Sequence, residues 1–145
     1  MPTQPVIIIP HLSFSSDCEE AIRAYIAAFG GEVHWLSRWS ADSRDVTPAQ
    51  IGKVMHAEFT LGSTRFAASD NPTTASGPVK LMVRMDNLAQ ARQAIALLAE
   101  GGEILSPLKP HPAPDDGGCG SLTRDRFGVT WVITCPNPAY EEAHP

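Results

Sequence analysis

Two stretches of this sequence follow the same pattern. Residues 17–33 read DCEEAIRAYIAAFGGEV, and residues 87–104 read NLAQARQAIALLAEGGEI. Each stretch opens with a residue that favours helix starts and continues with apolar residues at helical spacing. Each then passes through Gly-Gly into a further apolar segment. Because glycine tolerates the left-handed conformation that ends many helices, each stretch predicts a helix, a sharp stop and a new strand.

The two predicted helices carry the same signal at their start. Asp17 lies three residues before Glu20, and Asn87 lies three residues before Gln90. This is capping-box spacing, in which the first side chain accepts a hydrogen bond from an early helix N–H and the second reaches back. We therefore expect both side-chain pairs to cap their helices.

The similarity extends over the whole chain as an internal repeat. Gly30 aligns with Gly101, an offset of 101 − 30 = 71 residues, which is about half of the 145-residue chain. An apolar strand is expected before each helix, at 6–14 and 81–85, and a β-hairpin after it, at 54–69 and 121–135. The alternative to an internal repeat is that strand–helix–Gly–strand pieces recur by chance, since any α/β protein contains such pieces. The pattern predicts an α+β fold of two βαβββ modules in tandem, within one domain spanning 1–145. Module 1 covers about 5–70, module 2 about 78–136, and a C-terminal tail 137–145.

Composition excludes several classes of function. Hydrophobic residues make up 43% of the chain, charged residues 19%, and the formal net charge is -5 without any run of Lys or Arg, which argues against nucleic-acid binding. No apolar stretch approaches the roughly 20 residues that cross a bilayer, and the apolar run at residues 6–9 is too short for a signal peptide. The cysteines, Cys18, Cys119 and Cys135, are odd in number and lack CxxC spacing. They are typical of reduced thiols, so a cytoplasmic protein without membrane or nucleic-acid partners is expected.

Several short motifs, in order along the chain, resemble one superfamily. They are PHLSF at 10–14, CEEA at 18–21, VMHAE at 54–58, ASD at 68–70 and DRFGVTW at 125–131. The sequence resembles the PhnB-like branch of the vicinal oxygen chelate superfamily, which includes glyoxalase I, the bleomycin-resistance proteins and the extradiol dioxygenases. The resemblance implies the glyoxalase-like fold, in which curved mixed sheets enclose a cavity, and it implies a homodimer.

The resemblance also raises the question of a divalent metal. Enzymes of the superfamily hold the ion with His, Gln or Glu on the first and last strands of each module. His11 matches the first of these positions, but Lys80 to Val83 offers no such ligand in the second module, and Val132 stands near the position where Glu would be. Arg65 to Ser69 has no carboxylate. One filled position does not hold a catalytic ion, so we expect no metal and no cofactor.

A noncanonical metal site is the alternative. His56 and Glu58 alternate with apolar residues on a predicted strand and therefore share a face. Together with His11 they form a conceivable ligand set if all three side chains point inward. The simpler interpretation is that both histidines line a pocket or make hydrogen bonds on the sheet, and that Glu58 pairs with Arg65 across the hairpin.

The remaining pocket residues are expected from their chemistry. Trp39 and Trp131 offer flat apolar surface to a ligand, although core packing is an equal alternative for Trp131. Ser69 and Thr130 lie near predicted strand ends and offer hydrogen bonds. Lys109 to Gly118 is expected to be a mobile loop, and Cys119 lies in the Gly-rich stretch 117–120, which is also expected to be a loop. The full set expected around the pocket is His11, Trp39, His56, Glu58, Ser69, Thr130 and Trp131.

The sequence predicts a protein that binds an unidentified small organic molecule between its sheets, without a catalytic metal. The alternative is a metal-dependent lyase, isomerase or dioxygenase built on the noncanonical ligand set. A metal-free enzyme with His or Glu as general base also remains open, so the sequence identifies no catalytic residue and does not decide whether the protein is an enzyme. Some relatives are labelled methyltransferases, but no Gly-rich strand-to-helix loop of the cofactor-binding type supports that label here.

Overall fold

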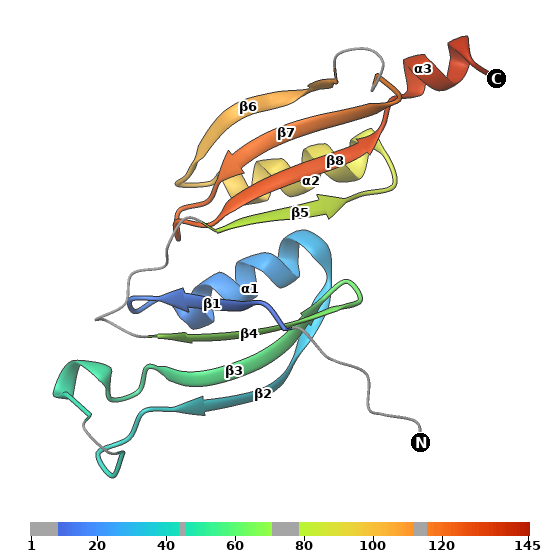
Figure 1. The fold of residues 1–145 in the computed structure, drawn as a ribbon. Helices are drawn as coiled ribbons and strands as arrows, with labels where there is room; N and C mark the ends of the chain where they lie inside the picture. Colours follow the sequence, from blue (N-terminus) through green and yellow to red (C-terminus); the bar gives the residue numbers. More distant parts are fainter. Residues whose placement is uncertain (1–8, 44–45, 71–78, 112–115) are drawn as a thin grey trace, which may run out of the picture. The chain divides into compact units, whose positions relative to one another are not determined.

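The structure is a computed structural model that describes residues 9–43, 46–70, 79–111 and 116–145. Its elements, labelled in Figure 1, are β1 (His11–Phe14), α1 (Cys18–Phe29), β2 (Gly31–Arg38), a 3-10 turn η1 (Pro48–Gln50), β3 (Val54–Leu61), β4 (Thr64–Asp70), β5 (Lys80–Arg84), α2 (Leu88–Ala99), β6 (Glu103–Pro110), β7 (Gly118–Arg124), β8 (Thr130–Pro136) and α3 (Pro138–Ala143).

The strands form two mixed sheets of the same design. One sheet has the order β1-β4-β3-β2, and the other has the order β5-β8-β7-β6. In each sheet the first strand runs parallel to the last, and the other pairs are antiparallel. The predicted α+β fold of tandem βαβββ modules is confirmed. The chain divides into two compact units, Met1–Ile26 with Gly30–Ala75 and Ala27–Phe29 with Ser76–Pro145.

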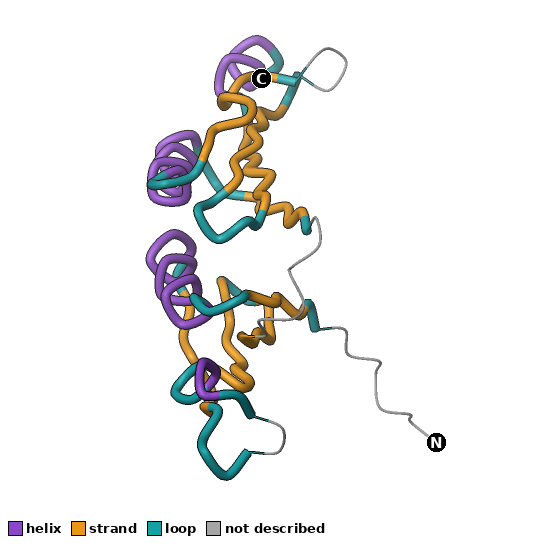
Figure 2. Tube along the Cα trace, turned by 90° about the vertical axis from the view of Figure 1, so that its left-hand side faces the viewer, coloured by secondary structure: helices purple, strands orange, loops and turns teal. Residues whose placement is uncertain are grey.

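In each unit one face of the sheet is covered by a helix (Figure 2). In the first unit, β3 alternates between buried residues and more exposed ones, as expected for a sheet with one covered face. The buried set includes Ala57 and Phe59, and the Phe59 ring stacks on Phe66 at 5.6 Å between centroids. Ala21, Ile22 and Tyr25 supply the buried face of α1. Burial of these apolar groups is the main stabilising term of the unit.

The second unit repeats this arrangement. The buried face of α2 consists of Ala91, Ala94, Ile95 and Leu98. On β8, Trp131 and Ile133 are buried to 1% and 0% exposure, whereas their neighbours along the strand are only half-buried. Trp131 therefore belongs to the buried face of this sheet.

The two Gly-Gly pairs have the same two roles in both units. Gly30 and Gly101 have φ angles of 77° and 71°, the left-handed region that favours glycine at a helix end. A Cβ added at Gly31 would collide with the backbone oxygen of Thr60, and one at Gly102 would collide with the backbone of Arg124. The first glycine thus ends the helix. The second, which has no side chain, allows the start of the next strand to lie close to the backbone of the neighbouring strand.

The helix caps agree with the sequence in one module only. The Asn87 side chain accepts a hydrogen bond from the N–H of Gln90 at 2.9 Å, as predicted, and the Gln90 side chain accepts from the N–H of Asp86. The predicted cap by Asp17 is wrong, because its side chain accepts no capping bond. The N–H of Cys18 instead donates to Asp70, a carboxylate from β4, at 2.9 Å.

The segment expected as a mobile loop, 109–118, is strand at both ends, because β6 continues through Pro110 and β7 begins at Gly118. Residues 112–115 in its middle lie outside the described residues. Cys119 lies within β7 and is 3% exposed, which corrects the expectation of a loop thiol. None of the helices in the described part of the chain is long and apolar enough to cross a membrane.

Candidate functional site

The first sheet has a second face whose side chains point away from the buried core. We call this the open face. It follows from alternation: Leu12 and Phe14 on β1 and Ala57 and Phe59 on β3 are buried, so the residues between them project to the opposite side. The open-face residues considered below are His11, Ser13, Trp35, His56, Glu58, Arg65 and Ser69.

His11 is the centre of a hydrogen-bonded group on this face. Its Nε2 lies 3.4 Å from the Ser69 hydroxyl, and its Nδ1 lies 3.4 Å from the Ser13 hydroxyl. Partial burial, with a further contribution from His56, lowers the pKa of His11 below its ordinary value of 6.5. The imidazole is therefore neutral at pH 7 and presents one donor and one acceptor nitrogen.

His56 joins this group to an ion pair. Its ring stacks on that of His11 at 6.2 Å between centroids, and its Nε2 lies 3.5 Å from Glu58 Oε2. The other carboxylate oxygen of Glu58 accepts from Arg65 Nη1 at 3.3 Å, so the predicted pairing of Glu58 with Arg65 is confirmed. The face thus carries two imidazoles and one compensated ion pair.

Trp35 is the residue of this face that sequence reasoning missed. Its indole is 52% exposed and lies 5.5 Å from the His56 ring, between centroids. A register shift between Val33 and Trp35 places Trp35 opposite Glu58. A bulge of this kind breaks the alternation of a strand, and the pattern of β2 gives no sign of it. The one available signal was a large aromatic residue in a strand that is otherwise mostly polar.

The other expected pocket residues lie elsewhere. The Trp39 indole N–H donates to the backbone oxygen of Asp70 at 3.3 Å, so this side chain packs at the end of β4. The Trp131 indole N–H donates to the buried carboxylate of Asp125 at 2.7 Å. Together with its burial, this contact favours the core alternative for Trp131. Its neighbour Thr130 projects from the opposite face of the second sheet.

The open face does not match the requirements of the superfamily's divalent metal. Three or four ligands must converge on such an ion. His11, His56 and Glu58 share the face, but no group of three or more His, Cys, Asp or Glu within the described ranges is arranged to hold an ion. The nitrogens of His11 are directed to two hydroxyl groups, and Glu58 is occupied by Arg65 and His56. The noncanonical ligand set is therefore not assembled in this structure.

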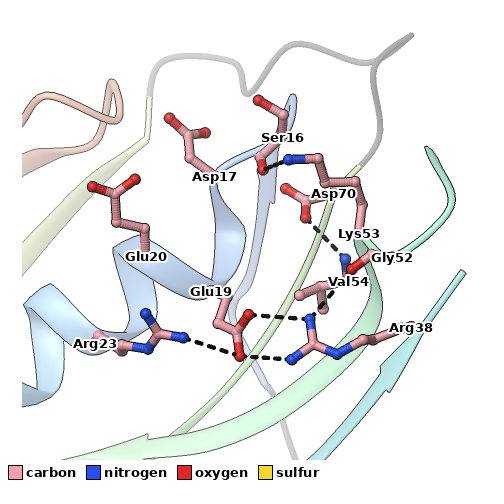
Figure 3. A pocket seen from close by; sticks show the side chains of 10 residues that line it. All are labelled: Ser16, Asp17, Glu19, Glu20, Arg23, Arg38, Gly52, Lys53, Val54 and Asp70. Carbon is pink, nitrogen blue, oxygen red and sulfur yellow. Dashed lines mark hydrogen bonds and ion pairs between the residues drawn. The ribbon is translucent and has the colours of Figure 1, made fainter. Parts of the chain in front are cut away.

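A separate cavity of about 600 Å³ lies at the start of α1 (Figure 3). Three of its charged groups, Glu19, Arg23 and Arg38, are bound to one another. Arg38 forms two hydrogen bonds with Glu19, at 2.8 and 3.1 Å, and Arg23 lies 3.4 Å from the same carboxylate. The hydrogen bond from Arg38, aided by the charges of both arginines, holds the pKa of Glu19 below its ordinary value. Lys53 donates to the backbone oxygen of Ser16. These contacts tie α1 to β2 and the following loop, and they favour a structural role for this cavity.

Known proteins share this architecture. A family model described as 3-demethylubiquinone-9 3-methyltransferase matches residues 6–134. The structure of the PhnB protein from Bacillus cereus is 27% identical and covers 90% of this chain and 99% of its own, with a TM-score of 0.77. That of protein PA1353 from Pseudomonas aeruginosa is 30% identical and covers 91% of this chain and 98% of its own, also with a TM-score of 0.77.

A more distant structure shows the same fold. It is a glyoxylase/bleomycin resistance protein/dioxygenase domain from Frankia, which is 11% identical with a TM-score of 0.65 and covers 99% of this chain and 100% of its own. No curated protein sequence matches significantly. From the family model and the structural relatives together, the chain belongs to the family described as 3-demethylubiquinone-9 3-methyltransferase, and it is similar to the PhnB protein of Bacillus cereus.

Proposed function

We propose that this protein binds a small organic molecule on the open face of its first sheet, without a catalytic metal. One observation carries the proposal: four of the seven residues expected around a pocket, His11, His56, Glu58 and Ser69, lie together on this face in mutual contact. Buried apolar residues alternate with them on the same strands, so folding alone does not require these polar side chains here.

The chemistry of the face indicates what kind of molecule it suits. The exposed Trp35 ring offers a flat surface on which a planar group can stack. Neutral His11 offers one donor and one acceptor, and Ser69 offers a hydroxyl. Within the described ranges, Arg65 donates to Glu58 through Nη1, and a guanidinium has further N–H groups to offer an acceptor. These features favour a planar, polar molecule over an aliphatic one.

Methyl transfer, which the family description names, has no corresponding feature in this chain. A nucleotide-like methyl donor is usually held by a Gly-rich turn between a strand and a helix. The described connections from a strand to an α-helix are Ser15 to Asp17, Met85 to Asn87 and Asn137, and none of them contains glycine. The proposal is therefore binding of a small molecule, with no assignment of a transfer reaction.

The proposal is tested by a ligand screen read out by NMR. A library of planar aromatic acids, amides and phenols is added to the uniformly labelled protein, and the perturbed amide signals are mapped. We expect them to cluster at residues 11–13, 56–58 and 65–69. His56→Ala should weaken the binding of any hit by about tenfold or more, as expected for a contact worth at least about 1.4 kcal/mol.

His144→Ala is the matched control, because His144 lies in the other unit, where its ring stacks on Tyr140 at 4.0 Å between centroids. Equal weakening by both variants, or hits that perturb no residue of the open face, would contradict the proposal. Metal analysis of protein purified without chelator tests the alternative. If the wild type binds one equivalent of divalent metal and His56→Ala does not, the metal-dependent alternative holds instead of metal-free binding.

A further inference from the structure

Two serine hydroxyls on the open face lie against the two ring nitrogens of His11. The parallel register of β1 and β4 pairs Ser13 with Ser69, so the two serines lie side by side. The Ser69 Oγ is 3.4 Å from His11 Nε2, and the Ser13 Oγ is 3.4 Å from His11 Nδ1. Both serines are half-buried. A hydroxyl, an imidazole and a second hydroxyl thus form one chain of contacts.

Hydrogen-bond chemistry gives this chain a direction. Partial burial and His56 lower the pKa of His11, so its ring is neutral at pH 7 and has one N–H and one bare nitrogen. With the proton on Nδ1, this N–H donates to Ser13, and Nε2 accepts from the Ser69 hydroxyl. A nucleophile that contacts a base, which a third group orients, is the arrangement of an activated nucleophile. Such contacts are often long without substrate and tighten when it binds.

The contact of Ser69 differs from those of other strand serines. The hydroxyls of Ser37 and Ser121 donate to backbone oxygen atoms of neighbouring strands. A backbone oxygen satisfies a hydroxyl but does not take its proton, whereas an imidazole nitrogen does. The partner of Ser69 is therefore one that can activate the hydroxyl.

The rings around Ser69 indicate the class of substrate. The register that pairs Ala57 with Ala68 brings the next residues, His56 and Ser69, to neighbouring positions on the open face. The His56 ring in turn lies 5.5 Å from that of Trp35, between centroids. An ester of a phenol has both parts that suit this face, since it offers a planar ring to the aromatic side chains and a carbonyl carbon to Ser69.

The hydrogen-bond donors of the face limit the expected rate. His56 and Arg65 are both engaged with Glu58, at 3.5 and 3.3 Å. In enzymes built for acyl transfer, removal of one donor to the developing oxyanion costs about 10²–10³ in rate. We therefore expect slow turnover and a need for an ester with a good leaving group.

We propose that Ser69 is a nucleophile that accepts the acyl group of an activated aryl ester, with His11 as its base and Ser13 as the residue that positions His11. The bond from Ser69 Oγ to the acyl carbon forms as the ester bond to the phenol oxygen breaks. The hydroxyl proton passes to His11 Nε2 and then to the leaving phenolate. Water later hydrolyses acyl-Ser69 to the free acid. The inference rests on the proposed function, because it names a substrate class for the same face.

The experiment treats the full-length protein with p-nitrophenyl acetate and, separately, with a fluorophosphonate probe. We expect a burst of about one equivalent of p-nitrophenolate followed by slower release, as for a covalent acyl intermediate. Tandem mass spectrometry should place the acetyl or phosphonyl group on Ser69. Ser69→Ala should abolish the burst and the label. His11→Gln should slow both reactions by about a hundredfold or more, as expected for loss of a general base.

The positioning role of Ser13 has its own test. Ser13→Ala should slow acylation by about tenfold, the loss expected for one hydrogen bond that orients the base. Ser13→Thr keeps the hydroxyl and should restore the rate of the wild type. A purely structural role of Ser13 would not give this rescue, so equal rates in the two variants would remove Ser13 from the proposal.

Ser106→Ala is the matched control, because Ser106 is also a half-buried strand serine but lies on β6 in the other unit. It should react like the wild type. The proposal is overturned if the wild type is not modified, if the label lies on another residue, or if Ser69→Ala reacts as fast as the wild type. Circular dichroism verifies that the variants fold, and if Ser69→Ala does not, the position of the label on the wild type decides.

The two proposals for this face fail in different ways. Hits on the open face in the NMR screen, together with an unmodified Ser69, would refute the nucleophile and leave the proposed function intact. A labelled Ser69 in a protein that binds no planar molecule reversibly would support the nucleophile and contradict the proposed function alone.

Discussion

Asp70 shows how much one buried side chain can organise. It is 2% exposed, and its two carboxylate oxygens accept from the backbone N–H groups of Cys18 and Val54, both at 2.9 Å. One carboxylate on β4 therefore caps α1 and fixes the start of β3. Its backbone oxygen also accepts from the Trp39 indole, so three segments meet at this residue.

Asp70→Ala should lower the free energy of unfolding by about 3 kcal/mol. Two buried backbone donors lose their acceptor, at about 1–3 kcal/mol each, and relaxation recovers part of that cost. Urea denaturation followed by circular dichroism measures the change. Asp42→Ala, at an exposed loop position, should leave the midpoint nearly unchanged. A small effect at Asp70 would show that water replaces the carboxylate without loss.

His11 should make the stability depend on pH. Because partial burial and His56 lower its pKa in the folded state, the unfolded chain binds more protons between that lowered pKa and 6.5. The contribution of His11 is thus complete above pH 6.5 and is lost as the pH falls through this window. His11→Gln should flatten the decline in Tm between about pH 7 and pH 5. His34→Gln is the control and should show the same decline in Tm as the wild type. If the Tm of His11→Gln falls as steeply as that of the wild type, groups other than His11 cause the pH dependence.

At the scale of elements, the two helices start by different means although their sequences look alike. Asn87 caps α2 through its own side chain, whereas α1 receives its cap from a distant strand. Capping-box spacing describes what a side chain can do locally. At Asp17 the tertiary contact with Asp70 supplies the acceptor instead.

Asn87→Ala should therefore destabilise the protein more than Asp17→Ala. Removal of a side-chain N-cap costs about 1 kcal/mol. Asp17 accepts no capping bond, so its replacement should cost less than half of that, through the helix dipole alone. Thermal unfolding of the two variants, measured side by side, gives the comparison. Equal losses would mean that Asp17 caps α1 in solution.

At the scale of the whole molecule, the two sheets have the same strand order, and Gly30-Gly31 and Gly101-Gly102 have equivalent positions and roles. The buried faces of the two sheets nevertheless differ in composition, because β3 and β4 of the first bury Phe59 and Phe66, whereas β7 and β8 of the second bury Cys119 and Cys135. The repeat thus supplies two copies of one scaffold, and each copy carries its own set of side chains.

Homodimer formation, which the resemblance to the superfamily implies, is a prediction for the whole chain. Size-exclusion chromatography with light scattering should give twice the chain mass of 15.6 kDa at micromolar concentration. If the measured mass is that of a single chain at every concentration, the predicted homodimer is wrong. The predicted cytoplasmic location is tested separately, by fractionation of cells that express the chain.

The sequence by itself determined the repeat, the helices with their stops, the hairpins and the shared face of His56 and Glu58. All of these depend on spacing along one segment or between neighbouring strands, where propensity and alternation act. The exposure of Trp35, the cap from Asp70 to α1 and the core position of Trp131 were decided by tertiary structure. Each depends on the register between segments far apart in the chain, or on a bulge that no local pattern specifies, because only packing selects among the alternative alignments of a strand.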